Sequence, residues 1–430
     1  MSLPNLVTSP QPHSANMADL RINERRLSAD FAALNRIGST GDGGVSRPAL
    51  SLEDLEARAW FAERIEEGGF FVRDDDAGNL SGVLLCDNPD AKTLLIGSHL
   101  DTIPNGGCYD GSIGILAGLE VLRTVQEAGV ALPFHLEVIN FTDEEGTWFS
   151  LLGSRSLTGR LPLGRLSARH GADGALRAAL SRAGIDIDRL KLAKRDPETI
   201  AMYLELHIEQ GNTLDRLGAQ IGVVRGIVGR TTLEITFHGE SGHSGTTDIH
   251  QRRDALQGAA MFITRLHLTV QDRFDGSVVN CGNLEVYPGT FNVVPSLARL
   301  SVEVRHVDAK ALGELEVQVV ELAQECAGRY SLLLEHQRGE HMDPAIMDDK
   351  IIDNIVQVAN RFALRHTSTV SYAGHDAQPM SAFTPSGMIF VPSVGGISHN
   401  PAEKTHWADV VNGANVLLQT TLQAAQRFTD

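Results

Sequence analysis

The feature that most constrains the fold is an alternation of strand and helix signals that is interrupted once along the chain. In the first half, apolar strand-like segments such as Thr93–Ser98 precede helical segments such as Ser112–Glu127. Near Ile221 the order of the predicted elements changes to strand, helix, strand, strand, helix, strand. The alternation of the first half returns at residue 335. Because alternating strands and helices pack as a sheet covered on both faces, this pattern predicts an α/β domain with a central mixed sheet and an inserted, smaller α+β (βαββαβ) domain.

The periodicity of the individual segments sets the expected boundaries. The first domain is expected over residues 1–220 and 335–430, and the inserted domain over 221–334. In the first domain, helical spacing and apolar runs predict helices over Ser51–Gly68, Ser112–Glu127, Asp349–Ala363 and Trp407–Arg427, and strands over Thr93–Ser98, Phe134–Phe141 and Met388–Val391. In the inserted domain they predict strands over Thr231–Phe237, Ser277–Leu284, Ala298–Val304 and Ser331–Glu335, and helices over Asp254–Val270 and Ala309–Ala327.

Composition argues against several classes of protein. The chain has 37 basic and 54 acidic residues and a net charge of −17, a surface that repels nucleic-acid phosphates. No apolar run approaches the roughly 20 residues of a membrane helix. The polar start, Met1–Ala15, lacks the pattern of a secretory signal and is expected to be a loose tail. The four cysteines form neither a C-x-x-C pair nor a disulfide framework, so a cytoplasmic location is expected.

Residues that can carry chemistry follow the predicted strands. His99 and Asp101 come directly after Thr93–Ser98. A neutral imidazole is a good zinc ligand, and a carboxylate on its other nitrogen fixes the tautomer. Asp110 lies in a Gly-rich turn just before the next helix. Its carboxylate can bridge two cations, one per oxygen, or it can simply cap that helix.

Three adjacent acids, Asp143, Glu144 and Glu145, follow the strand expected over Phe134–Phe141. Neighbouring carboxylates at the end of a strand repel one another unless a positive charge compensates them. One of them can then bind a cation while its neighbour carries a proton. The alternative is a solvated acidic turn.

Two further segments contribute imidazoles. In a strand, Glu205, His207 and Glu209 would share one face, and so polar a face is poor core material. His399 lies in a Gly-rich loop, four residues before Glu403, although a single histidine in a loop is usually just solvated. Taken together, the imidazoles and carboxylates suit Zn²⁺ or Mn²⁺, and soft thiolates are absent from these segments.

Seven motifs in this order resemble the metal-dependent amidase branch of the aminoacylase/carboxypeptidase clan. That branch contains N-carbamoyl-L-amino-acid hydrolases, β-ureidopropionases and allantoate amidohydrolases. The motifs are GSHLDTIPNGGCYDGSIGILAGLEVL (97–122), FTDEEG (141–146), ELHIEQG (205–211), GHSGTT (242–247), FNVVPS (291–296), AGHDAQ (373–378) and GISHNPAE (396–403). Two details favour this branch over the clan's peptidases: Asp110 is followed by a glycine, and His207 stands where many peptidases use a carboxylate.

The resemblance implies two divalent metal ions per subunit, Zn²⁺ or Mn²⁺, with Co²⁺ or Ni²⁺ as substitutes. The implied ligands are His99 and His207 for one ion, Glu145 and His399 for the other, and Asp110 as the bridge. Asp101 would orient His99, and Glu144 would be the general base that takes a proton from the attacking water and passes it to the departing nitrogen. His375 and Glu209 would lie behind the ligands.

The resemblance also places substrate-binding residues, mostly on the inserted domain. His243 would stabilise the oxyanion, and Asn292 and Arg305 would bind the substrate carboxylate, Arg305 as a two-pronged fork. Gln210 would contact the ureido end. In relatives some lid residues come from the partner subunit, which implies a homodimer formed through a lid and dimerisation domain. The alternative is that His243 caps a loop and Arg305 is a surface strand residue.

The implied reaction is hydrolysis of the linear ureido C–N bond of an N-carbamoyl-L-amino acid, giving the amino acid, CO₂ and ammonia. The alternatives are allantoate or ureidoglycolate hydrolysis in purine breakdown, a β-ureidopropionase, and a dipeptidase or aminoacylase. The substrate would be a small ureide with a carboxylate, with neither nucleic acid nor membrane as a partner. A non-catalytic relative on this scaffold would have lost Glu144 or a ligand, and all six positions are filled here.

Overall fold

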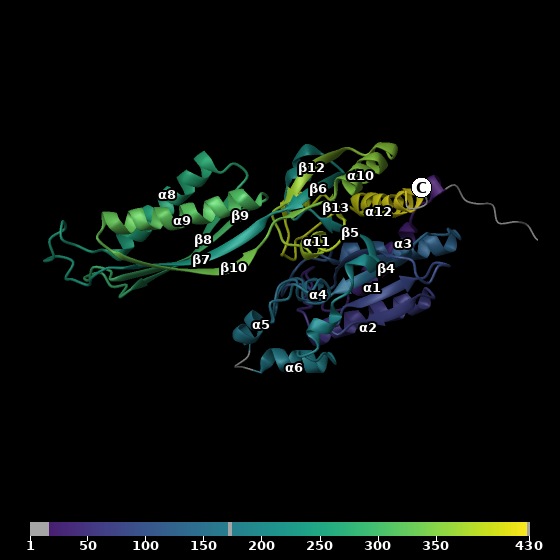
Figure 1. Cartoon of the computed structure of the whole chain (residues 1–430), viewed down its shortest axis with the longest axis horizontal. Coiled ribbons are helices and arrows are strands. Elements are labelled where there is room, and N and C mark those ends of the chain that lie inside the picture. The colour runs from purple at the N-terminus through teal and green to yellow at the C-terminus, as the bar shows by residue number, and fades with distance from the viewer. Residues whose placement is uncertain (1–16, 171–173, 428–430) are drawn as a thin grey trace, which may run out of the picture. The chain divides into compact units, whose positions relative to one another are not determined.

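The computed structural model describes residues 17–170 and 174–427, and the chain folds into two compact units (Figure 1). The first unit comprises the described residues up to Val224, Met347–Ser368 and those from His375 onward, and the second comprises Arg225–Ile346 and Thr369–Gly374. The tail expected over Met1–Ala15 lies outside the described residues. Among the residues that the structure describes, no helix combines the length and apolar character that crossing a bilayer requires.

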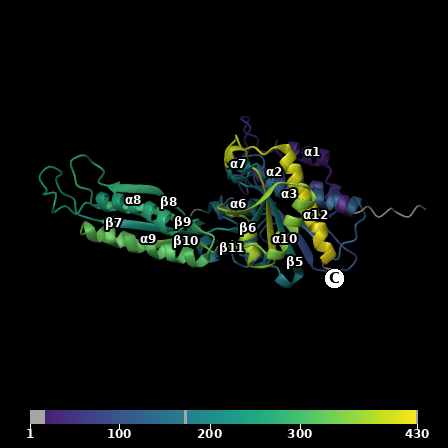
Figure 2. The ribbon, with the colours of Figure 1, turned by 90° about the horizontal axis from the view of Figure 1, so that it is seen from above.

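The first unit is built on a mixed sheet with the strand order β1-β2-β4-β3-β5-β13-β6, and the short strands β11 and β12 also pair with β6. Several of these strands, among them β5 and β6, are labelled in Figures 1 and 2. The strands are β1 (Phe71–Asp74), β2 (Leu80–Leu84), β3 (Thr93–His99), β4 (His135–Phe141), β5 (Ile200–Ile208), β6 (Ile221–Ile227), β11 (Ala345–Ile346), β12 (His366–Ser371) and β13 (Ser386–Val391). The central strands β4, β3, β5 and β13 are parallel to their neighbours within this group. Their carboxyl ends therefore open at one edge of the sheet.

Helices cover both faces of this sheet. Leu206 of β5 lies where a Cβ on Gly413 of α12 would meet it, at 2.8 Å, whereas the next residue back, Glu205, accepts a hydrogen bond from the N–H of Ala377 in α11. Since successive strand residues point to opposite faces, α12 and α11 lie on opposite sides. α3 packs on the face of α12, and Gly118 allows it to approach closely, because a Cβ there would lie 2.7 Å from Val138.

The helices of the first unit have sequence-readable starts in several places. Ser51 caps α2 by accepting from the N–H of Asp54 at 3.2 Å, as its position predicts. The α-helices are α1 (Glu24–Leu34), α2 (Leu52–Glu67), α3 (Ser112–Glu127), α4 (Leu152–Leu157), α5 (Leu163–His170), α6 (Ala175–Arg182), α7 (Thr213–Leu217), α10 (Asp349–Arg361), α11 (Ala377–Ser381) and α12 (Trp407–Arg427). The 3₁₀ turns are η1 (Met17–Asp19), η2 (Leu190–Ala193), η3 (Pro197–Thr199) and η4 (Val394–Gly396).

The second unit is a four-stranded antiparallel sheet with two helices packed against its core. Its strand order is β10-β7-β9-β8, and its elements are β7 (Gly229–His238), α8 (Ala255–Arg273), β8 (Val278–Tyr287), β9 (Leu297–His306), α9 (Ala309–Arg329) and β10 (Leu333–Met342). Apolar residues of both helices and of the strands form one buried cluster. The expected βαββαβ order and the α/β class of the first unit are confirmed.

The boundary of the second unit differs from the expected end at residue 334. The strand β10 continues to Met342 because it pairs with β7 as far as Arg230, across a register shift between Arg338 and His341. The unit ends at Ile346, and the short return Thr369–Gly374 also belongs to it. The strand predicted over Ser331–Glu335 ends too early because the residues that continue β10 are mostly polar and exposed, so that no apolar run marks its end.

Candidate metal centre

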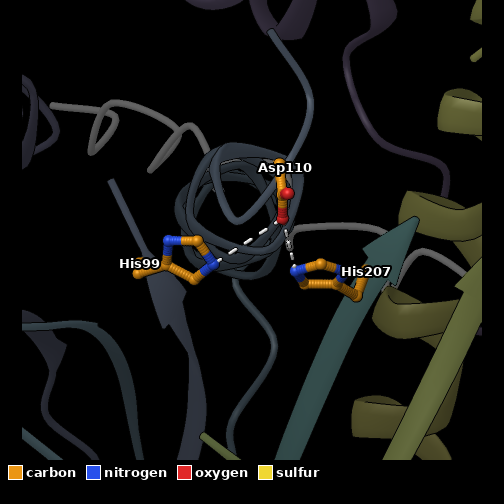
Figure 3. A group of neighbouring side chains, drawn as sticks. All are labelled: His99, Asp110 and His207. Carbon is orange, nitrogen blue, oxygen red and sulfur yellow. Dashed lines mark ion pairs between the residues drawn. The ribbon is translucent and has the colours of Figure 1, made fainter. Parts of the chain in front are cut away.

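The carboxyl ends of the four central strands bring the predicted ligands together. His99 is the last residue of β3, His207 lies one residue before the end of β5, and Glu145 follows the end of β4. Asp110 comes from the loop before α3, and His399 from the loop after β13. Figure 3 shows Asp110 pointing between the rings of His99 and His207. Segments far apart in the sequence thus meet at one edge of the sheet.

The two oxygens of Asp110 face different imidazoles. Oδ1 lies 3.1 Å from Nε2 of His207 and 3.8 Å from Nε2 of His99. Oδ2 lies 3.3 Å from Nε2 of His399, which is also 3.3 Å from Oε2 of Glu145. In each of the two resulting sets, the candidate ligand atoms lie within 4.8 Å of one another. We call them the inner donor group (His99, His207, Asp110) and the outer donor group (Glu145, His399, Asp110).

Both imidazoles of the inner donor group are fixed by backbone oxygens. Nδ1 of His99 lies 2.9 Å from the backbone oxygen of Asp101, and Nδ1 of His207 lies 2.9 Å from that of Ile208. A carbonyl oxygen only accepts, so each Nδ1 carries the proton and each Nε2 is presented to Asp110. Burial lowers the pKa of His99 to about 4. Burial also acts to lower the pKa of His207, but the hydrogen bond to Asp110 opposes it, and the pKa of His207 is raised to about 9.

The side chain of Asp101 does not orient His99 as expected. Its Oδ1 lies 3.8 Å from Nδ1 of His99, beyond hydrogen-bonding distance. The carboxylate accepts instead from the backbone N–H groups of Glu144 at 3.3 Å and of Glu145 at 3.2 Å. The backbone of Asp101 therefore orients the imidazole, while its side chain positions the acidic turn.

The concentration of negative charge fits the binding of cations. Glu144 is 8% exposed, and burial, followed by the charge of Glu145, raises its pKa well above the usual value. Burial, followed by the charge of Asp110, does the same to the pKa of Glu145. The ion-pair partners of these carboxylates are imidazoles. Two divalent cations would neutralise this charge, and nitrogen and carboxylate oxygen donors suit Zn²⁺ or Mn²⁺.

Gln210 lies at the candidate metal centre, but Glu209 does not. Nε2 of Gln210 donates to Oδ2 of Asp110 at 2.9 Å and lies 3.5 Å from Nε2 of His399. The carboxylate of Glu209 accepts instead from the backbone N–H groups of Thr213 and Leu214 at 2.9 Å, so that it caps α7. The expected face of alternating residues ends early because β5 ends at Ile208 and Gln210 adopts a left-handed φ of 57°.

A buried polar layer that includes His375 lies behind His207. The ring of His375 packs edge-on against that of His207, with centroids 4.4 Å apart. Glu205 is fully buried and accepts from the hydroxyl of Tyr203 at 2.9 Å and from the N–H of Ala377 at 2.8 Å. Burial raises the pKa of Glu205 to about 7. This layer supports the strand that presents His207.

Sequence reasoning missed two residues of the site, Ser398 and Glu403. Oγ of Ser398 lies 3.3 Å from Oδ2 of Asp110 and 3.0 Å from Oε2 of Glu403. Burial, followed by the charge of Asp110, raises the pKa of Glu403 to about 7. The spacing of His399 and Glu403 was the available signal, but spacing does not reveal which distant backbone groups a carboxylate contacts.

The predicted substrate residues His243, Asn292 and Arg305 lie in the second unit. His243 forms an isolated bridge with Val293, and the N–H of Ser244 donates to the backbone oxygen of Asn292 at 3.0 Å, so that the two predicted residues lie on adjoining segments. Both are exposed. Arg305 of β9 donates through Nε to Glu303 at 2.7 Å and through Nη1 to the backbone oxygen of Tyr372. The candidate metal centre lies wholly within the first unit.

A parallel-strand edge at which imidazoles and carboxylates converge on one aspartate defines a metal-dependent hydrolase. The chain belongs to the Peptidase family M20/M25/M40, which it matches over residues 95–423. It is 36% identical to an N-carbamoyl-L-amino acid amidohydrolase from Geobacillus stearothermophilus, over 94% of this chain and 99% of the relative. It is 32% identical to an allantoate amidohydrolase from Escherichia coli K12, over 91% and 96%.

A solved structure supports the same assignment. The crystal structure of an amidase of the hydantoinase/carbamoylase family from Burkholderia multivorans superposes with a TM-score of 0.85 at 32% identity, covering 94% of this chain and 98% of that one. The resemblance drawn from the seven motifs is thus confirmed, and the chain is an amidohydrolase of the hydantoinase/carbamoylase type within its family.

Proposed function

We propose that the protein hydrolyses the ureido C–N bond of N-carbamoyl-L-amino acids and that each subunit holds two divalent ions, Zn²⁺ or Mn²⁺. The observation that carries this proposal is the position of Asp110, whose oxygens face the inner donor group and the outer donor group separately. The relative from Geobacillus stearothermophilus, named an N-carbamoyl-L-amino acid amidohydrolase, supports the choice of substrate. The products would be the amino acid, CO₂ and ammonia.

Glu144 would carry the proton in this reaction. Its Oε2 lies 3.6 Å from Nε2 of His99, beside the inner donor group, and its backbone is held by Asp101. When bound, divalent ions polarise a carbonyl group and lower the pKa of water. In that position a carboxylate can first accept the proton of the attacking water and then deliver it to the departing nitrogen.

Residues of both units would bind the substrate. Gln210, already within hydrogen-bonding distance of Asp110, would contact the ureido end. In the second unit, His243 would donate to the oxyanion, and Asn292 and Arg305 would bind the carboxylate. This arrangement is proposed for a homodimer formed through the second unit.

The surface of the second unit supports such a dimer. The strand β8 is the edge of its sheet, and apolar side chains on and next to this strand are exposed: Val278, Leu284, Tyr287 and Phe291. An edge strand with exposed apolar residues is a ready surface for pairing with a second chain.

The four cysteines are free thiols, in keeping with the reducing cytoplasm that we propose as the location.

Allantoate hydrolysis is the second candidate activity, because the relative from Escherichia coli bears that name. Allantoate and N-carbamoyl amino acids share a ureido group and a carboxylate, so the same donors and the same Arg305 fork would serve both. The two substrates differ in the volume beside the α-carbon, which decides between them.

An ammonia-release screen tests the proposed function. The metal-loaded enzyme is assayed for ammonia with a series of N-carbamoyl-L-amino acids, β-ureidopropionate, allantoate and ureidoglycolate. A dipeptide, whose cleavage is followed by the release of free amino acids because it yields no ammonia, is the peptidase control. We expect the highest kcat/KM for an N-carbamoyl-L-amino acid, loss of turnover after chelation, and recovery on adding Mn²⁺ or Zn²⁺. Ammonia release from none of these ureides, or full activity in the chelated protein, would overturn the proposal.

A further inference from the structure

The carboxylate of Glu403 joins the two loops that carry Asp110 and His399. Its Oε1 accepts from the backbone N–H groups of Tyr109 at 3.0 Å and of Asp110 at 3.1 Å. Its Oε2 accepts from the hydroxyl of Ser398 at 3.0 Å. Glu403 is only 7% exposed. One side chain therefore holds the backbone of a proposed bridging ligand and the residue next to His399.

The Gly-rich loop before Asp110 is shaped around this carboxylate. A Cβ on Gly107 would lie 2.0 Å from both Cδ and Oε1 of Glu403, far inside contact distance. The φ of Gly107 lies outside the left-handed region, so the glycine is required for space and not for backbone conformation. The loop can approach Glu403 this closely only without a side chain at position 107.

The two donor groups differ in how firmly the structure holds them. In the inner donor group, the side chains of His99 and His207 are 1% exposed, and their Nδ1 atoms are fixed to backbone oxygens. In the outer donor group, the side chain of His399 is 47% exposed, and its backbone adopts a left-handed φ of 54° in a loop. The outer group is thus the one whose geometry depends on how the two loops are joined.

We propose that Glu403 is a positioning residue for the ion of the outer donor group. By fixing the amides of Tyr109 and Asp110 relative to Ser398, it holds Oδ2 of Asp110 and Nε2 of His399 at the separation that one cation requires. Loss of this link weakens the binding of the ion at the outer donor group, while the ion at the inner donor group keeps its two imidazoles, which the strands hold in place. The inference rests on the proposed two-ion site.

Three variants separate the hydrogen bonds of Glu403 from its bulk and charge. Glu403→Ala leaves the N–H groups of Tyr109 and Asp110 without this acceptor. Glu403→Gln keeps an amide oxygen in the place of Oε1 and so preserves both bonds. Gly107→Ala displaces the carboxylate without removing any polar group. Its matched control is Gly106→Ala, whose Cβ would lie 3.0 Å from Cγ1 and 3.3 Å from the backbone oxygen of Ile103, a much smaller overlap than at Gly107.

The measurement is ion binding by the full-length, metal-stripped protein. Mn²⁺ is titrated calorimetrically, and bound metal is counted by elemental analysis after dialysis, with circular dichroism confirming that each variant is folded. We expect two ions in the wild type, Gly106→Ala and Glu403→Gln. In Glu403→Ala and Gly107→Ala we expect one ion at wild-type affinity and a second weakened about 10- to 100-fold, the usual effect of losing a residue that orients ligands. Excess Mn²⁺ should then restore most of kcat.

The outcomes separate the two proposals. Wild-type affinity for the second ion in Gly107→Ala, or equal weakening of both ions, would overturn the role of Glu403, and Gly107→Ala decides the matter even where Glu403→Ala does not fold. A wild-type protein that binds fewer than two ions would instead overturn the proposed function. A loss in Gly106→Ala as large as that in Gly107→Ala would show a general sensitivity of the loop and would also reject the inference.

Discussion

His99 donates its Nδ1 proton to the backbone oxygen of Asp101 at 2.9 Å, while the Asp101 carboxylate stays 3.8 Å from that nitrogen. The carboxylate is thus available for the amides of Glu144 and Glu145. A single residue therefore aligns an imidazole through its main chain and the acidic turn through its side chain. The two functions can be separated by mutation, because only one of them depends on the side chain.

Asp101→Asn should lower kcat and leave the ion content unchanged. The main-chain bond to His99 remains, but the amide group has one acceptor oxygen for two backbone N–H groups. Leaving one buried N–H unpaired costs about 1–3 kcal/mol, so we expect kcat to fall by roughly 5- to 150-fold. Steady-state kinetics and elemental analysis of bound metal check this. Loss of one ion, with a wild-type kcat for the enzyme molecules that still hold both ions, would show that the carboxylate acts on His99 after all.

Glu144→Gln should retain both ions and lose most of the turnover. The amide has the same shape but cannot take a proton, and general acid–base catalysis contributes about 10²- to 10⁴-fold, so kcat should fall by that factor. Glu209→Gln is the matched control, since Glu209 caps α7 and an amide oxygen can still accept there. A near wild-type kcat in Glu144→Gln would remove Glu144 from the proton transfer.

The residues at the strand ends of the site were predictable from the sequence because two local signals mark them, an apolar run and the polar residues that follow it. An apolar run followed by His99, or by Glu144 and Glu145, is visible in a few residues. Parallel strands then bring such ends to one edge whatever the loops between them do. The ordered motifs supplied what local patterns lacked, namely that His207 and His399 belong to the same edge.

The rest depends on contacts that no local pattern encodes. Glu403 accepts from the amide of Tyr109 across 294 positions, and the need for glycine at 107 follows from that contact alone. Glu209 was misplaced because the alternation continues past Ile208 in the sequence, whereas the strand ends there and Gln210 turns into the left-handed region.

A buried ion pair makes the first unit sensitive to acid. Arg195 donates two hydrogen bonds to Glu137, at 2.7 and 2.8 Å, with side chains 7% and 1% exposed. Against the effect of burial, Arg195 lowers the pKa of Glu137 below its ordinary 4.5. The stability that this pair contributes is therefore complete above about pH 4.5 and is lost as the pH falls through the lower, folded-state pKa.

Glu137→Gln should destabilise the protein at neutral pH and much less in acid. Removing one partner leaves the Arg195 charge buried, which costs about 3–5 kcal/mol. Because the wild type loses its own pair on protonation, the difference in the free energy of unfolding should shrink below pH 4.5. Urea denaturation between pH 7 and pH 3 measures it. Glu198→Gln, in an exposed pair with Lys92, should have little effect at any pH; a pH-independent difference for Glu137→Gln would contradict the linkage.

Arg305→Ala should raise KM for carboxylate-bearing ureides with little change in kcat. A hydrogen bond between two charged groups is worth about 1.5–3 kcal/mol, so KM should rise by roughly 10- to 150-fold. Arg299→Ala is the control, because Arg299 lies on the same strand and pairs with Glu234 and Glu285. Arg305→Lys keeps the charge but not the fork and should lie between the two.

A substrate analogue whose carboxylate is replaced by an amide distinguishes a contact between Arg305 and the substrate from a purely structural role of Arg305. If Arg305 grips the carboxylate, wild type and Arg305→Ala should have the same KM for this analogue. Arg305 also donates to Glu303 and to the backbone oxygen of Tyr372, so a purely structural role would raise KM equally for both substrates. An equal increase in KM for both substrates would therefore reject the carboxylate contact. An increase in KM confined to the substrate with the carboxylate establishes the contact, because only that substrate offers Arg305 a charged group.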